Sequence, residues 1–225
     1  MSELRQIHLK ENLLKANDFV ASTMRDRFGA QGSFVVNLLS SPGSGKTTLL
    51  EKALPKLQER HSVLVLEGDL ETERDAERIR GVGVRALQMT TGGACHLEAH
   101  QIQQTYAQIE EEGPWDFVFI ENVGNLVCPA SYDLGEHVRT VLLSVPEGED
   151  KPPKYPKAFH SSHQMLITKT DLIEHFDFRI DEVERLAREL QPKIEIFTMS
   201  AKTGDGVDAW IDSLLTARER LFAAS

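Results

Sequence analysis

The chain has 225 residues, of which 40% are hydrophobic and 27% charged, as expected for a globular protein large enough to bury a core. With 25 lysines and arginines against 35 aspartates and glutamates, its net charge is −10, which argues against a nucleic-acid partner. Two cysteines exclude a disulfide framework, and the sequence predicts neither a signal peptide nor a membrane span. We therefore expect a cytoplasmic protein with no membrane partner.

The first 30 residues read as an amphipathic helix that precedes the main domain. Apolar side chains recur there at roughly helical spacing, namely at Ile7, Leu14, Phe19, Val20, Met24 and Phe28. The sequence GAQG at 29–32 then breaks the pattern. We divide the chain into a helical extension at 1–30 and a single domain at 31–225, with no linker inside it.

Short apolar runs alternate with helical patterns throughout the main domain. The runs lie at 33–39, 62–69, 84–89, 115–122, 138–145, 164–171 and 193–200, and helices are expected near 46–59, 71–80, 97–111, 180–190 and 207–220. This alternation predicts an α/β fold with a mostly parallel central sheet of about seven strands and helices on both faces. The proline-rich stretch 145–159 suits neither a central strand nor a long helix, so it predicts a mobile or partner-facing loop, or a plain solvated connector.

The segment SSPGSGKT at 40–47 follows an apolar strand and opens a helix, which is the setting of a P-loop. Its backbone N–H groups would surround the β-phosphate, Lys46 would bridge the β- and γ-phosphates, and Thr47 would bind Mg²⁺. Ser40 stands where this motif usually begins with glycine. The sequence therefore predicts a P-loop NTPase whose phosphate site comprises Gly43, Ser44, Gly45, Lys46, Thr47 and Thr48.

Two later segments indicate which base is bound. ITKTD at 167–171 resembles the guanine-reading Asn-Lys-x-Asp, because Asp171 can accept hydrogen bonds from N1 and N2 of guanine, although Thr168 replaces the asparagine. The Lys169 stem would cover the base, and in MSAKTG at 199–204 the Ala201 N–H would meet guanine O6. These features favour GTP and GDP over ATP, with a base site of Lys169, Asp171, Ser200, Ala201 and Lys202.

The parts expected for hydrolysis lie at the ends of two further strands. Glu121 and Gly124 resemble Asp-x-x-Gly, so Glu121 would hold the Mg²⁺ hydration shell and the Gly124 N–H would meet the γ-phosphate. Asp69 would orient water or Mg²⁺, although it could instead cap the following helix. We therefore assign Lys46, Asp69 and Gly124 to catalysis and Thr47, Asp69 and Glu121 to magnesium. Since no glutamine is plainly placed to orient water, we expect slow hydrolysis.

Cys95, His96 and Cys128 form a candidate metal site. Both segments that carry them lie beyond the carboxyl ends of strands, where they can converge near the nucleotide. Two thiolates and one imidazole suit Zn²⁺ or Ni²⁺, and three ligands leave a shell for water or a second chain to complete. The alternative is ordinary packing, because cysteine is among the residues most often buried.

Taken together, six segments resemble the hydrogenase-maturation nickel-insertion GTPases, the HypB family of SIMIBI-class P-loop GTPases, from about residue 30 to the C-terminus. The resemblance implies a GTPase metallochaperone that helps deliver Ni²⁺ to the [NiFe]-hydrogenase large-subunit precursor, together with a partner nickel metallochaperone. It also implies a GTP-dependent homodimer, metal ligands Cys95, His96 and Cys128 at its interface, and Lys154 or Lys151 reaching the partner's nucleotide. The six segments are NLLSSPGSGKTTLL, EGDLETERDAERI, TTGGACHLEAHQI, FIENVGNLVCPASYDLGE, VPEGEDKPPKYPKAF and SAKTGDGVDAWI.

Some members of this family begin with a Cys-x-x-Cys-Gly-Cys motif and others with a His-rich nickel store, and this N-terminus has neither. Two alternatives stay open. One is a GTPase metallochaperone for another nickel enzyme of the urease accessory type, whose Cys-Pro-His motif is here split between Cys-His at 95–96 and Cys-Pro at 128–129. The other is a nucleotide-switched interaction protein with a structural zinc site.

Overall fold

A single seven-stranded sheet forms the centre of the computed structural model, which describes residues 3–69 and 73–223, with side chains from residue 11 onward. The strand order is β3-β2-β4-β1-β5-β6-β7, and every neighbouring pair is parallel. The predicted fold class is thereby confirmed. The strands are β1 (Phe34–Ser40), β2 (Val63–Asp69), β3 (Arg85–Thr90), β4 (Phe117–Glu121), β5 (Val138–Ser144), β6 (Gln164–Thr168) and β7 (Glu195–Thr198).

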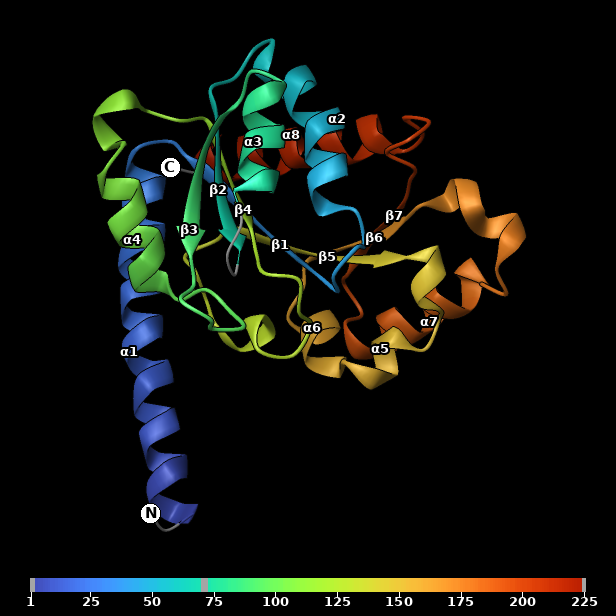
Figure 1. Ribbon diagram of the computed structural model, residues 1–225, viewed down its shortest axis with the longest axis horizontal. Coiled ribbons are helices and arrows are strands. Elements are labelled where there is room, and N and C mark those ends of the chain that lie inside the picture. The colour runs from blue at the N-terminus through green and yellow to red at the C-terminus, as the bar shows by residue number, and fades with distance from the viewer. Residues whose placement is uncertain (1–2, 70–72, 224–225) are drawn as a thin grey trace.

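Helices cover both faces of this sheet (Figure 1). One face packs against α2 (Lys46–Gln58), α3 (Arg74–Gly81) and α8 (Val207–Ala223). On the other face, α1 (Glu3–Ala30) and α4 (Ala99–Ala107) cover the half around β2, while α6 (Pro156–His160) and α7 (Ile180–Leu190) cover the half around β5 and β6. The helix expected at 97–111 is shorter in the structure, where α4 spans Ala99–Ala107. The helix expected at 71–80 corresponds to α3, and its residues 71–72 lie outside the described residues.

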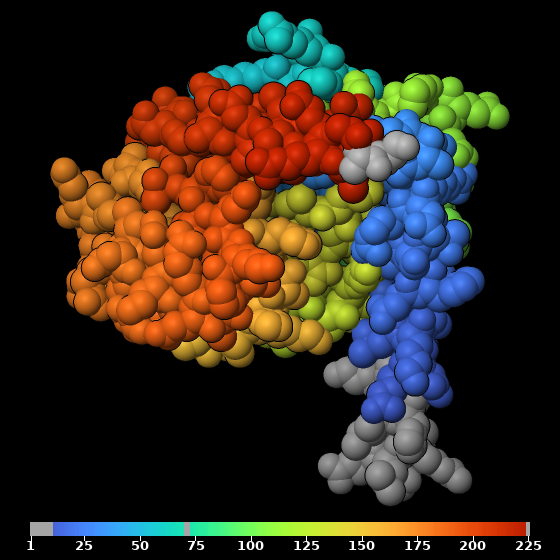
Figure 2. Space-filling view, turned by 180° about the vertical axis from the view of Figure 1, so that it is seen from behind, coloured from blue at the N-terminus to red at the C-terminus, as the bar shows by residue number. Residues whose placement is uncertain are grey.

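Helix α1 follows only part of its predicted amphipathic pattern. Met24 and Phe28 are buried against α4, where the Phe28 ring meets Tyr106 edge to face at 4.8 Å. Phe19, however, is 76% exposed, because it lies on the other side of α1 from the buried Asn17 and Ala21. The first part of α1 extends past the sheet (Figures 1 and 2). The side chain of Ile7 lies outside the described residues. No helix within residues 3–69 and 73–223 is both long and apolar enough to span a membrane.

The stretch 145–159 is not the expected loop. It forms a 3₁₀ turn at Val145–Glu147, then α5 (Lys151–Lys154) and α6. Its prolines occupy first helical turns, where the missing N–H is not needed. Val145 and Phe159 are buried, so the stretch is anchored to the core at both ends, while Pro153 and Lys154 between them are exposed.

Candidate functional site

The turn between β1 and α2 lies at the carboxyl end of the sheet, where ligands of such folds bind. Gly43 and Gly45 adopt φ angles of 76° and 98°, a conformation that other residues reach only with strain. Lys46 is nearly buried, and its Nζ donates a hydrogen bond to Ser40 Oγ at 3.0 Å. Ser40, in the place of the usual glycine, therefore supplies an acceptor that positions the P-loop lysine.

Two buried carboxylates stand beside Thr47. The Thr47 hydroxyl donates to Glu121 Oε1 at 2.7 Å, and Glu67 lies directly opposite Glu121 in the register of β2 and β4. Both glutamates are 2% exposed, and the Oε2 of each has no hydrogen-bond partner among the described residues. Buried oxygens without donors are suited to a divalent cation.

Burial is the main reason why both carboxyls hold their protons more tightly than usual. It raises the pKa of Glu121 to about 6 and that of Glu67 to about 8. The negative charge of Glu121 adds to the effect on Glu67, as do Asp69 and Asp75. A cation bound here would offset this repulsion.

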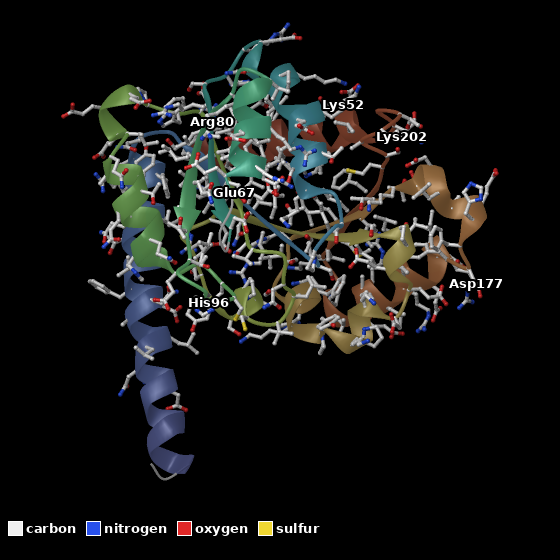
Figure 3. All side chains as sticks on the ribbon, in the orientation of Figure 1. Lys52, Glu67, Arg80, His96, Asp177 and Lys202 are labelled. Atoms are coloured by element: carbon white, nitrogen blue, oxygen red, sulfur yellow. The ribbon has the colours of Figure 1, made fainter. Side chains whose placement is uncertain are left out.

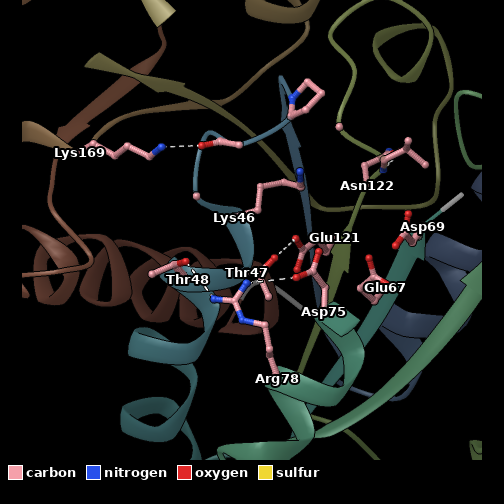
Figure 4. Close-up of a pocket in the computed structure, with 16 residues that line it drawn as sticks. Lys46, Thr47, Thr48, Glu67, Asp69, Asp75, Arg78, Glu121, Asn122 and Lys169 are labelled. Carbon is pink, nitrogen blue, oxygen red and sulfur yellow. Dashed lines mark hydrogen bonds and ion pairs between the residues drawn. The ribbon is translucent and has the colours of Figure 1, made fainter. Parts of the chain in front are cut away.

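A cavity of about 430 Å³ opens over these groups (Figure 4). Asp69 and Gly124, which the sequence analysis assigns to catalysis, both line it. A Cβ on Gly124 would lie 3.0 Å from the Cα of Pro42, so only glycine lets this backbone approach the P-loop so closely. The full lining is Pro42, Gly43, Gly45, Lys46, Thr47, Thr48, Glu67, Gly68, Asp69, Asp75, Arg78, Glu121, Asn122, Val123, Gly124 and Lys169.

Four lining residues with charged or amide side chains escaped the sequence analysis, namely Glu67, Asp75, Arg78 and Asn122. Glu67 could have been found, because it precedes Asp69 by two residues on one strand and so shares its face. Arg78 donates to Thr48 Oγ1 at 3.1 Å and to both oxygens of Glu51, and this pairing across α2 and α3 has no sequence motif.

A second cavity, of about 300 Å³, adjoins the first and is lined by four of the five residues predicted to form the base site, all but Ser200. Ser200 Oγ donates to Asp171 Oδ1 at 2.7 Å and so fixes the carboxylate. Thr168 Oγ1 donates to the Ser44 carbonyl at 2.7 Å, and Lys169 Nζ to the Gly43 carbonyl at 2.7 Å. The threonine that replaces asparagine thus still ties this motif to the P-loop.

The lining of the second cavity includes Ala201 and Lys202 beside Asp171. Lys202 Nζ lies 3.8 Å from Asp171 Oδ2, although the lysine is 79% exposed. Lys154 is exposed on α5 and belongs to neither cavity of this one chain. Lys151, three residues earlier, forms an ion pair with Asp150. That Lys154 or Lys151 reaches the nucleotide of a second copy therefore stays a prediction.

The structure also brings Cys95, His96 and Cys128 together. One ligand atom of each lies within 4.8 Å of the others, and His96 Nδ1 is 3.8 Å from Cys95 Sγ. The His96 ring stacks on Tyr132 at 3.9 Å (its position is shown in Figure 3), which fixes the imidazole plane. The pKa of the Cys95 thiol is raised, and its hydrogen bond with the Cys128 thiol is the largest cause.

Exposure separates this cluster from a structural metal site. Cys95 is exposed and Cys128 half-buried, and neither is in a disulfide. Two thiols and an imidazole fit a soft or borderline ion, and three ligands leave coordination positions open. The arrangement therefore suits an ion that is taken up and released better than one that is locked in place.

Comparison with known proteins identifies relatives of this chain. The family CobW/HypB/UreG, nucleotide-binding domain, matches residues 34–198. The chain is 47% identical over 212 residues to the hydrogenase maturation factor HypB of Azotobacter vinelandii, covering 94% of this chain and 69% of that protein. It is 44% identical over 224 residues to the hydrogenase/urease maturation factor HypB of Helicobacter pylori, covering 98% of this chain and 92% of that protein.

A solved structure shows the same similarity in three dimensions. The crystal structure of HypB from Helicobacter pylori in complex with nickel superposes with a TM-score of 0.88 at 45% identity. The match covers 92% of this chain and 97% of that one. The likeness therefore runs through nearly the whole of both chains.

Proposed function

Because the chain belongs to the HypB hydrogenase maturation factors of the CobW/HypB/UreG family, we propose that it is a GTP-hydrolysing metallochaperone for nickel. Its client would be the large-subunit precursor of a [NiFe]-hydrogenase, and a partner nickel metallochaperone would supply the ion. One observation carries the proposal: the phosphate cavity and the Cys95–His96–Cys128 cluster lie at the same edge of the sheet, joined by the segment 121–128.

In this proposal the nucleotide is GTP or GDP. Lys46 and the backbone N–H groups of 43–47 hold its phosphates at the start of α2. Asp171, fixed by Ser200, accepts hydrogen bonds from N1 and N2 of guanine, and the stem of Lys169 covers the base. Adenine offers no such pair of donors, which is why we assign guanine.

Thr47, Glu121 and Asp69 would hold a Mg²⁺ ion beside the phosphates. The unpartnered Oε2 of Glu121 supports this assignment, and Glu67 stands ready to contribute from the next strand. When bound, the ion neutralises charge on the phosphate oxygens. Asp69 orients water and the Gly124 N–H meets the γ-phosphate, while no glutamine lines the described cavity, so we propose slow hydrolysis.

Nickel is the cargo of the proposed reaction. Cys95, His96 and Cys128 would bind Ni²⁺ or Zn²⁺, and the open coordination positions would be filled by water, by the same residues of a second copy, or by the recipient. GTP would favour that second copy, and Lys154 would then reach its nucleotide. The metal site and the nucleotide site would in this way complete each other in the homodimer.

Urease is a second candidate client. It is favoured by the similarity to the Helicobacter pylori protein, whose name includes urease maturation. Nickel incorporation into apo-hydrogenase and apo-urease precursors, measured side by side with this chain present, distinguishes the two. Incorporation into the hydrogenase precursor alone is expected.

The central experiment is a metal titration of the full chain in its GDP form and with a non-hydrolysable GTP analogue. Ni²⁺ and Zn²⁺ are titrated against a chromophoric chelator, and the oligomeric state is followed by sedimentation. We expect Cys95→Ala/Cys128→Ala to weaken metal binding by at least about 100-fold, because both thiolates are lost. The variant His175→Ala removes an exposed histidine outside the cluster and should bind like wild type.

Two results would overturn parts of this proposal. Unchanged metal stoichiometry and affinity in the double cysteine variant would show that the cluster is not the metal site. A single oligomeric state with GDP, with the analogue and without nucleotide would contradict the GTP-dependent dimer.

A further inference from the structure

We infer that Asn125 is the positioning residue that transmits the nucleotide state to the Cys95–His96–Cys128 cluster. The inference rests on the proposed function, since it concerns the regulation of that metal site. The Asn125 side chain is half-buried in the loop after β4, between the nucleotide site and the metal site.

Both ends of the Asn125 carboxamide are hydrogen-bonded, and each bond serves a different loop. Its Oδ1 accepts from the Val127 N–H at 2.8 Å, which closes the turn that leads to Cys128. Its Nδ2 donates to the carbonyl oxygen of Cys95 at 3.3 Å, 30 residues earlier in the chain. A single side chain therefore ties together the two loops that carry the thiols.

The same loop is attached to the nucleotide site immediately before Asn125. Glu121 accepts from Thr47, and the Asn122 N–H donates to the Leu38 carbonyl at 3.1 Å. Gly124 then lies against Pro42 of the P-loop so closely that a Cβ would be 3.0 Å from the proline Cα. Gly124 and Asn125 are consecutive residues, so any shift of the Gly124 backbone at the γ-phosphate moves the Asn125 side chain.

Movement of Asn125 changes the metal site through geometry. The bond to the Cys95 carbonyl holds the Cys95 loop in register with the Cys128 loop, and the three ligand atoms converge only while that register is kept. Metal sites are sensitive to such displacements because the ligand distances must be met within about 0.2 Å. Nucleotide exchange would thus alter metal affinity without any direct contact between the two ligands.

A competing route exists and gives a different prediction. Leu97, next to His96, is fully buried against Gly68, and Gly68 adjoins Asp69 of the phosphate cavity. This contact is apolar packing that anchors the start of the α4 segment. If it carried the coupling, loss of the Asn125 side chain would leave the coupling intact.

The test compares Ni²⁺ dissociation constants of the full chain in the GDP form and with a non-hydrolysable GTP analogue. Asn125→Asp keeps the acceptor for Val127 but replaces the donor to Cys95 with an oxygen, and Asn125→Ser is too short to reach. Wild type should show at least about a fivefold difference between the two forms. In both variants that ratio should fall to less than about twofold, and the added charge of aspartate cancels in the ratio.

Val127→Ala is the matched control, because this side chain lies in the same loop, is 59% exposed and leaves the backbone bond in place. It should keep the wild-type ratio. The reciprocal measurement, affinity for the GTP analogue with and without Ni²⁺, must change by the same factor in wild type and lose that change in the Asn125 variants.

Each outcome decides something. Variants that weaken Ni²⁺ equally in both forms and keep the ratio would show that Asn125 only supports the fold of the loop, and the inference would be wrong. Variants that match wild type throughout would point to the Leu97 contact instead. If wild type binds no Ni²⁺, or binds it equally in both forms, the proposed function itself fails in its metal or coupling part.

Discussion

The carboxyl ends and the amino ends of the strands, which form two opposite edges of the central sheet, differ in whether their buried glutamates are hydrogen-bonded. At the carboxyl edge, Glu67 and Glu121 each keep a buried oxygen without a hydrogen-bond partner among the described residues. At the amino edge, the buried Glu136 accepts from Arg139 Nε at 2.7 Å and from the Leu134 N–H at 2.8 Å. The buried glutamates of one edge keep oxygens available, whereas both carboxylate oxygens of Glu136 at the other edge are hydrogen-bonded.

The contrast extends to the side chains around each glutamate. Arg139 also donates to the carbonyls of Ala130 and Tyr132, so it fastens a loop to β5. By comparison, the Lys46 ammonium donates a hydrogen bond to Ser40 Oγ and faces a cavity. Buried polar groups without partners reduce stability, and proteins keep them where a ligand will use them. The comparison therefore predicts that function and stability can be damaged separately.

The largest effect is expected at the carboxyl edge. Lys46→Ala should reduce single-turnover GTP hydrolysis by at least about 1,000-fold, because the charge that stabilises the transferred phosphate is lost. Its thermal unfolding temperature should not fall, since the variant removes a buried cation with few partners. Wild-type hydrolysis would refute the P-loop assignment, and a large loss of stability would break the comparison between the edges.

The next largest effect is expected at the amino edge and should show the reverse pattern. Arg139→Met leaves Glu136 buried without its cation, which should cost about 3 kcal/mol of unfolding free energy in urea titrations. GTP affinity should stay within about twofold of wild type. The double variant Arg139→Met/Glu136→Leu should recover much of the lost stability, because no unpaired charge is then left behind. Equal losses in the single and double variants would mean that the ion pair is not what stabilises this edge.

The two edges also differ in how far the sequence predicts them. The P-loop, Glu121 and Gly124 could be placed from the sequence, because glycine spacing and strand ends encode local backbone geometry. Parallel strands likewise predict that segments after different strands meet at one edge, which is how Cys128 could be matched with Cys95 and His96. The amino-edge pair of Glu136 and Arg139 has no local motif, since its burial depends on how β1, β5 and α1 pack together.

Failures of the sequence analysis have the same cause. The sequence could place Glu67 on the same strand face as Asp69, but not opposite Glu121, because that pairing depends on the register of β2 against β4. The stretch 145–159 was expected to be a loop because of its prolines, whereas the burial of Phe159 against α7 decides its structure. Phe19 matches helical spacing only roughly and points into solvent, because the side of α1 that packs against the domain carries Asn17, Ala21 and Met24 instead. Tertiary contacts overrule local pattern at each of these positions.

The smallest predicted effect is a pH dependence of the unfolding free energy, which arises from a histidine at the amino edge. The His137 ring Nδ1 accepts from the backbone N–H of Val35 at 2.9 Å, and the backbone N–H of His137 donates to the Val35 carbonyl at 2.9 Å. Burial, followed by the charge of Arg25, lowers the pKa of His137 to about 4. An unfolded histidine titrates near 6.5, so the unfolded state binds more protons between these values and stability falls as the pH drops from about 6.5 to 4, by up to about 1.4 kcal/mol per unit. His137→Asn keeps an acceptor without titrating, and urea unfolding at pH 7, 5.5 and 4.5 should show a shallower loss for it than for wild type; parallel losses would remove His137 from the forces that hold this edge together.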